Sequence, residues 1–153
     1  MSPEQRLADL GLSVPDVARP VAAYVPAVRS GSLVYTSGQL PFRAGELVAP
    51  GKVGADVDVE TARECAQVCV LNALAAVRAE VGELSAVRRV VKVVGFVASE
   101  PGFTGQPQVV NGASELLGSA FGDEAGQHAR SAVGVAVLPL DAPVEVELVV
   151  EVG

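Results

Sequence analysis

Hydrophobic and polar residues alternate with two different periods along this chain, and these periods predict its elements. Two β-rich runs, residues 24–29 and 33–37, flank a short Ser-Gly-Ser turn and predict a β-hairpin. Hydrophobic and small residues recur three and four positions apart over residues 57–81, which predicts a long helix with one buried face. Gly82 is expected to end this helix, because glycine readily adopts the conformation of a C-terminal cap.

The second half of the chain predicts a strand, a helix and a terminal pair of strands. Residues 87–99 form one long β-rich run, which a Glu-Pro-Gly sequence ends. A second helix is expected over residues 107–121, before a glycine-rich turn at 122–126. Two strongly hydrophobic runs follow at 128–139 and 144–152. The short Leu-Asp-Ala-Pro connection between them predicts a second hairpin that closes the sheet.

Shorter segments complete the predicted chain. Residues 3–10 suit one or two turns of amphipathic helix, with Ser2 as the N-cap and proline at the first helical position. Residues 14–20 form a connector interrupted by prolines. Residues 41–55 are rich in glycine and proline and predict a loop, with a short edge strand at 46–48.

The two terminal strands carry charged residues within otherwise hydrophobic runs. Because strand side chains alternate between two faces, Arg130 shares a face with Ala132 and Gly134. By the same rule, Glu145 lies on the other face of the last strand from Val144 and Val146. We expect the valine-rich faces to pack together against helices. This leaves Arg130 and Glu145 on a second face lined with small residues, which predicts a site for a small polar ligand.

The predicted order β-β-α-β-α-β-β favours an α+β fold in which one sheet carries its two main helices on one face. At 153 residues, the chain is expected to form a single domain, residues 1–153, in which residues 1–20 add an N-terminal extension with a short helix. The uncovered apolar face of the sheet would need burial by another copy of the chain. A hydrophobic fraction of 50% with only 19% charged residues also favours self-association.

Charge and cysteine content exclude several classes of function. The net charge of −7 disfavours nucleic-acid binding, since proteins that bind nucleic acids present a basic face. Cys65 and Cys69 share one helix face and are expected to be small buried residues with free thiols. No zinc-ligand spacing, signal peptide or long apolar segment is evident. We therefore expect a cytoplasmic protein that binds neither a metal nor a membrane.

Several short motifs occur together in an order that resembles one known family. They are Tyr24, Val34-Tyr35-Thr36-Ser37-Gly38-Gln39-Leu40-Pro41, Asn111, Ala129-Arg130-Ser131-Ala132-Val133 and Val144-Glu145-Val146-Glu147. In this combination they resemble the RidA/YjgF family of reactive-intermediate (enamine/imine) deaminases, which are also named endoribonuclease L-PSP-like. The resemblance covers roughly residues 20–152. It implies a chorismate-mutase-like fold assembled as a homotrimer, with clefts between neighbouring subunits.

The resemblance also implies an activity and its residues. Arg130 matches an arginine that binds the carboxylate of a small 2-enamino or 2-imino acid, as the bidentate guanidinium group suits. Glu145 matches a glutamate that orients or activates the water attacking the imine carbon, so that ammonia leaves and a 2-keto acid remains. A carboxylate beside an arginine is expected to stay ionised. Further matching positions line the same cleft: Tyr24, Ser37, Asn111 and the backbone of Ala132. No metal or organic cofactor is implied.

Alternatives remain open from the sequence. The clefts could bind a carboxylated metabolite without turnover, or the chain could be a ribonuclease, as the older family name indicates. Arg130 could pair with a carboxylate across a subunit interface. His128 could serve as an acid or base, although a solvated loop position is the simpler interpretation. The sequence departs from the best-known branch in having Ala132 where cysteine is usual and Ala22-Ala23 where glycine-proline precedes the tyrosine.

Overall fold

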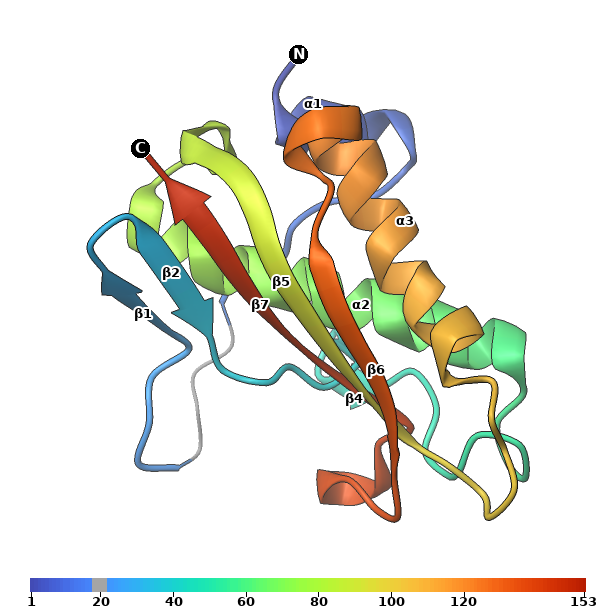
Figure 1. Ribbon diagram of the computed structural model, residues 1–153. Helices are drawn as coiled ribbons and strands as arrows, with labels where there is room; N and C mark the ends of the chain where they lie inside the picture. The colour runs from blue at the N-terminus through green and yellow to red at the C-terminus, as the bar shows by residue number, and fades with distance from the viewer. Residues whose placement is uncertain (18–21) are drawn as a thin grey trace.

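The protein folds into two layers, a mixed β-sheet and helices on one of its faces (Figure 1). The computed structural model describes residues 1–17 and 22–153. The sheet contains β1 (Ala27–Ser30), β2 (Leu33–Thr36), β5 (Val87–Ala98), β6 (Ala129–Val135) and β7 (Val144–Val152). The α-helices are α1 (Pro3–Asp9), α2 (Val59–Val81) and α3 (Gln106–Ala125). This arrangement confirms the predicted α+β class and order.

Local sequence signals set the ends of the helices, with Ser2 and Gly82 in their predicted roles and Asp58 as a further cap. Ser2 caps α1, its hydroxyl accepting from the Gln5 N–H at 3.2 Å. Asp58 caps α2 by accepting from the Thr61 N–H at 2.8 Å. Gly82 ends α2 with a φ of 89°, a conformation that favours glycine. The connector predicted at residues 14–20 lies partly outside the described residues.

The first predicted hairpin is confirmed, and the edge strand after it belongs to a separate small sheet. β1 and β2 pair antiparallel around Gly31, whose φ is 61°. The strand predicted at 46–48 forms as β4 (Glu46–Leu47), which pairs only with β3 (Phe42–Arg43). The predicted loop therefore folds into its own two-stranded hairpin beside the main sheet.

The predicted terminal hairpin is wrong. The strand order is β1-β2-β7-β5-β6, so β5 separates the last two strands of the chain. β6 runs parallel to β5 and β7 runs antiparallel to it. The segment β5-α3-β6 is a crossover unit, and such a unit places its two strands parallel and adjacent. The connection to β7, which includes the short 3-10 helix η2 (Pro139–Asp141), then leads the chain past the end of β5.

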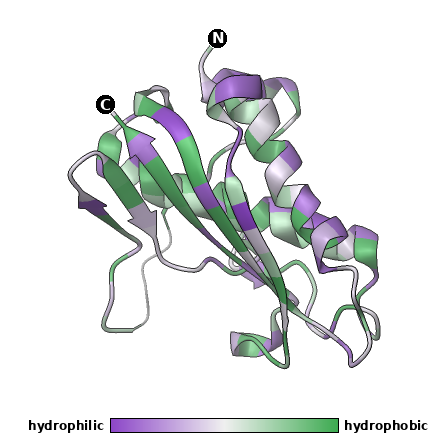
Figure 2. Cartoon of the chain, in the orientation of Figure 1, coloured by the Kyte–Doolittle hydropathy of each residue, from purple (hydrophilic) through white to green (hydrophobic). Residues whose placement is uncertain are grey.

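The hydrophobic core lies between the sheet and the helices. Alternate residues of β7 are buried, from Val144 to Val152, and the residues between them are half-buried. Hydrophobic residues predominate in the central strands (Figure 2). Helix α2 also packs tightly against α3, since an added Cβ at Gly112 would lie 2.4 Å from the carbonyl oxygen of Arg63. The core therefore fixes α3 relative to both α2 and the sheet.

No helix of residues 1–17 or 22–153 covers the opposite face of the sheet (Figure 1). It exposes hydrophobic side chains, among them Val28, Tyr35 (45% exposed) and Val133 (44% exposed). We call this surface the open face. No helix among the described residues is long and apolar enough to cross a membrane.

Candidate active site

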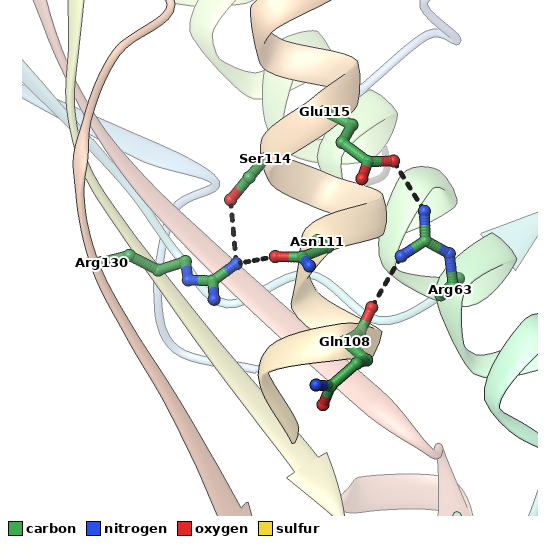
Figure 3. Close-up of polar contacts among 6 residues, drawn as sticks. All are labelled: Arg63, Gln108, Asn111, Ser114, Glu115 and Arg130. Carbon is green, nitrogen blue, oxygen red and sulfur yellow. Dashed lines mark hydrogen bonds and ion pairs between the residues drawn. The ribbon is translucent and has the colours of Figure 1, made fainter. Parts of the chain in front are cut away.

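Arg130 reaches from β6 toward helix α3 (Figure 3). Its Nη1 donates to Oδ1 of Asn111 at 2.7 Å and to Oγ of Ser114 at 3.3 Å. Asn111 and Ser114 are three residues apart, so both lie on the same face of the helix. The structure thus brings together two of the predicted site residues, Arg130 and Asn111. It adds Ser114, which could have been found from its helical spacing to Asn111.

The predicted shared face of Arg130 and Glu145 is wrong. Arg130 aligns with Val93 of β5, and Val93 aligns with Leu148 of β7, so these three side chains point toward the helices. Glu145 is three residues from Leu148 along an unbulged part of β7 and therefore points to the open face. Ala132 and Gly134, which share the face of Arg130, make room for α3. The sequence pattern of one strand does not show which of its faces a helix covers.

No carboxylate among the described residues neutralises Arg130. The ion pairs found in residues 1–17 and 22–153 are Arg43–Glu64, Lys52–Asp141 and Arg63–Glu115. Arg63 also reaches α3, but it pairs with the Glu115 carboxylate at 2.6 Å (Figure 3). Both partners of Arg130 are neutral oxygens. Because a half-buried cation is stabilised by an anionic partner, this guanidinium is suited to bind an external anion.

His128 lies in the connection just before β6, as the simpler interpretation expected, but it is half-buried and part of the same cluster. Its Nε2 lies 2.8 Å from Ser114 Oγ. Its Nδ1 lies 2.7 Å from the carbonyl oxygen of Gly126. The imidazole therefore contacts α3 on the same side of the sheet as Arg130.

Glu145 occupies a crowded place on the open face. An added Cβ at Gly38 would lie 2.0 Å from Oε1 of Glu145, so this carboxylate takes the space that a side chain at position 38 would fill. Burial raises the pKa of Glu145, and the nearby charge of Glu147 raises it further. Within one chain Arg130 lies on the other face of the sheet, so it does not lower the pKa of Glu145 there. The glycine of the Ser-Gly-Gln motif has a clear role that sequence reasoning missed.

Ser37 connects the segment that carries Tyr24 to the end of β2 by two hydrogen bonds. Its hydroxyl donates to the carbonyl oxygen of Val25 at 2.6 Å, and its N–H donates to the Pro26 carbonyl at 2.8 Å. Tyr24, the next residue before Val25, is 54% exposed. Ser37 thus holds the backbone at Val25 and Pro26. It directly precedes Gly38, where the absence of a side chain leaves room for the Glu145 carboxylate.

Ala132 lies on β6, which among the strands of the described residues is at the sheet edge and pairs with β5. The carbonyl of Val135 accepts from Ser99 of the β5 side at 3.0 Å, so odd-numbered residues of β6 direct their backbone groups toward β5. Alternation then directs the N–H and C=O of Ala132 to the free edge. Its methyl group packs against the core. The Ala132 backbone is therefore exposed to a ligand or to another chain.

The predicted residues form two groups on opposite faces of one sheet. We call the first the arginine half-site: Arg130, Asn111, Ser114 and the Ala132 backbone. The second is the glutamate half-site, which consists of Glu145, Gly38 and Ser37; Tyr24 lies in the segment that Ser37 holds through the Val25 carbonyl. One chain cannot place a small ligand against both charged side chains, because the sheet lies between them.

The cysteines stand apart from this chemistry. Cys65 and Cys69 are free and buried, as predicted, and Cys69 donates to the Val144 carbonyl at 3.6 Å. Burial raises the pKa of Cys65 to about 11 and raises that of Cys69 as well, so both thiols are protonated at neutral pH. Across residues 1–17 and 22–153, no group of three or more His, Cys, Asp or Glu side chains is placed to hold a metal ion.

Comparison with known proteins gives the family. A profile described as "YjgF/chorismate_mutase-like, putative endoribonuclease" matches residues 4–152. Protein TCP17 of Trypanosoma cruzi is 44% identical over 94% of this chain and 90% of its own length. A 2-iminobutanoate/2-iminopropanoate deaminase of Dermatophagoides farinae is 34% identical over 91% of this chain and 93% of its own length.

The fold comparison agrees with the sequence comparison. The crystal structure of Atu1372, a protein of unknown function from Agrobacterium tumefaciens, superposes with a TM-score of 0.93. It is 47% identical and covers 99% of this chain and 92% of its own. The crystal structure of the YjgF gene product of E. coli superposes with a TM-score of 0.65 at 28% identity, over 89% of this chain and 93% of its own, and the profile spans nearly the whole chain. The chain therefore belongs to the YjgF/RidA family, with its chorismate-mutase-like fold.

Proposed function

We propose that this protein hydrolyses small 2-imino acids, and the 2-enamino acids in equilibrium with them, to 2-keto acids and ammonia. In the balanced reaction, water adds to the C=N carbon of the iminium acid, the C–N bond then breaks, and a keto acid and an ammonium ion result. The proposal agrees with the name of the deaminase relative, which is 34% identical. The reaction needs a carboxylate anchor and a base for the water.

The observation that supports the proposal most is that Arg130 has no anionic partner among the described residues. Its guanidinium is half-buried, is held by neutral oxygens of Asn111 and Ser114, and has no ion pair within the described residues. A carboxylate can take two parallel hydrogen bonds from the remaining N–H groups. The exposed N–H of Ala132 lies on the free edge of the same strand and offers a further donor.

Glu145 is the proposed base. Burial raises its pKa within one chain, and Arg130 of a neighbouring copy would offset this rise and keep the carboxylate ionised, so that it can accept a proton from water. Glu145 would take a proton from the attacking water and return it to the leaving nitrogen. No metal enters this scheme.

A complete site requires two copies of the chain. The arginine half-site of one copy would face the glutamate half-site of its neighbour, which the opposite orientation of Arg130 and Glu145 in one chain demands. The open face supports such an assembly, because it exposes Val28, Tyr35 and Val133 around the glutamate half-site. The family resemblance makes a homotrimer the assembly to test first.

An amino-acid oxidase that generates imino acids in situ provides the test. We expect the protein to accelerate ammonia release from several imino acids, and we expect Arg130→Ala and Arg130→Lys to lose most of this acceleration. Lysine cannot reproduce the planar fork of arginine. Arg88→Ala at the far end of β5 is the matched control and should behave as wild type. Equal acceleration by wild type and Arg130→Ala would reject the proposal.

Two other outcomes would assign a different function. Calorimetric binding of a keto acid at Arg130 without any acceleration would identify a carboxylate-binding protein. RNA cleavage that persists through repeated purification would identify a ribonuclease. The net charge of −7 argues against this second outcome, because it repels a polyanion.

A further inference from the structure

A series of hydrogen bonds connects His128 to Ser114 of the arginine half-site, and the proposed reaction does not use these bonds directly. His128 Nδ1 lies 2.7 Å from the Gly126 carbonyl oxygen, and His128 Nε2 lies 2.8 Å from Ser114 Oγ. Because a carbonyl oxygen only accepts, Nδ1 carries the proton. Nε2 of the neutral imidazole is then an acceptor, and the Ser114 hydroxyl donates to it.

This donation orients Ser114 toward Arg130. With its proton on the His128 side, the Ser114 oxygen accepts from Nη1 of Arg130 at 3.3 Å (Figure 3). The same Nη1 donates to Asn111 at 2.7 Å. A terminal guanidinium nitrogen has two N–H groups, so these two oxygens occupy both of them. The three N–H groups on Nη2 and Nε are left for a ligand.

We propose that Ser114 and His128 are positioning residues that fix Arg130 so that its Nε–Nη2 edge binds the substrate carboxylate. This inference rests on the proposed function of Arg130. Neither Ser114 nor His128 touches the substrate in this account. They hold the plane of the guanidinium before the ligand arrives, which lowers the cost of ordering that flexible side chain on binding.

The expected effect is on binding rather than on the chemical step. The carboxylate contact is the same in the ground state and in the transition state, so its loss raises KM and leaves kcat nearly unchanged. Removing the Ser114 hydroxyl deletes one hydrogen bond to a charged group, and we expect a weakening of about three- to tenfold. Ser114→Thr keeps the hydroxyl and should restore most of the affinity.

Calorimetry with pyruvate, a small 2-keto acid, measures this effect. The variants are Ser114→Ala, Ser114→Thr and Arg130→Ala, with Ser119→Ala as the matched control because Ser119 is exposed on the same helix. Ser114→Ala should raise the pyruvate Kd about three- to tenfold, while Ser119→Ala should bind as wild type does. His128→Phe, which keeps the ring but removes the acceptor, should act in the same direction and tests the same link if Ser114→Ala does not fold.

The outcomes separate this inference from the proposed function. If Arg130→Ala loses pyruvate binding and the Ser114 and His128 variants bind as wild type, the positioning role is wrong and the proposed function stands. If Arg130→Ala binds pyruvate as wild type does, the proposed function itself fails. Nitrogen-15 NMR of the only histidine adds an independent check. A proton on Nε2 instead of Nδ1 would also overturn the inferred direction of the hydrogen bonds.

Discussion

Gly38 and Glu145 show how one residue can determine the position of a proposed catalytic base. The Glu145 carboxylate lies in the space that a Cβ at position 38 would occupy, at 2.0 Å from Oε1. A methyl group there would force the carboxylate to move. The need for glycine therefore comes from a long-range contact with β7 and not from a turn.

We predict that Gly38→Ala lowers kcat/KM by about 100-fold, because displacement of a catalytic group by about 1 Å costs on this order. The fold should remain, as judged by circular dichroism. Gly118→Ala is the control, since a Cβ at Gly118 on α3 would meet no atom within 4 Å. That variant should keep full activity and gain about 0.5–1 kcal/mol of stability from helix propensity. An active Gly38→Ala enzyme would contradict the assigned role of Glu145.

Glu147 is expected to set the pH dependence of the reaction through Glu145. The proposed base must be ionised, so activity falls as the pH drops through the pKa of Glu145, which burial and the charge of Glu147 hold above its ordinary value. Glu147→Gln removes the negative charge that raises the pKa of Glu145. The acidic limb of the kcat/KM profile should therefore move to lower pH. Glu151→Gln, further along the same strand face, should leave the limb in place. A shift to higher pH in Glu147→Gln would contradict this account.

At the scale of elements, α3 is the part that makes the arginine half-site. It lies over β5 and β6, supplies Asn111 and Ser114, and is held close to α2 at Gly112. The position of one helix thus fixes the acceptors for Arg130 and links the site to the core.

We predict that Gly112→Ala destabilises the protein, because its Cβ would lie 2.4 Å from the Arg63 carbonyl oxygen and push the two helices apart. The cost should be about 1–3 kcal/mol, the range for an overpacked interface. For a chain of this length, each kcal/mol lowers Tm by about 2–4 °C. Thermal unfolding beside Gly118→Ala measures the difference, and an unchanged Tm for Gly112→Ala would rule out the tight helix contact.

The elements themselves were predictable, but their pairing was only partly so. Periodicity and caps predicted the helices and strands because these signals lie within each segment, as for Ser2 at the start of α1 and Gly82 at the end of α2. The crossover through α3 makes β6 pair with β5. The short connection between β6 and β7 favours a hairpin instead and so gives the wrong neighbour. The faces of Arg130 and Glu145 were misassigned for the same reason, since the face that becomes buried depends on where a helix packs.

At the scale of the whole molecule, the separation of the two half-sites is the central feature. The sequence predicted Arg130 and Asn111, and the structure joins them by a hydrogen bond. It also predicted Glu145, which lies on the other side of the sheet. The family resemblance predicted clefts between subunits, but the alternation pattern placed Arg130 and Glu145 on one face, because it does not show that β5 lies between β6 and β7.

Complementation between two inactive variants tests this central claim most directly. Arg130→Ala and Glu145→Gln are each expected to be inactive alone, and they are co-expressed in equal amounts and purified together, without separation of mixed from uniform oligomers. With random mixing, about a quarter of the clefts between copies would combine an intact Arg130 from one chain with an intact Glu145 from its neighbour. We predict that imino-acid hydrolysis recovers to about a quarter of the wild-type rate per chain. Mixed oligomers with no activity above that of the separate variants would contradict a site shared between copies.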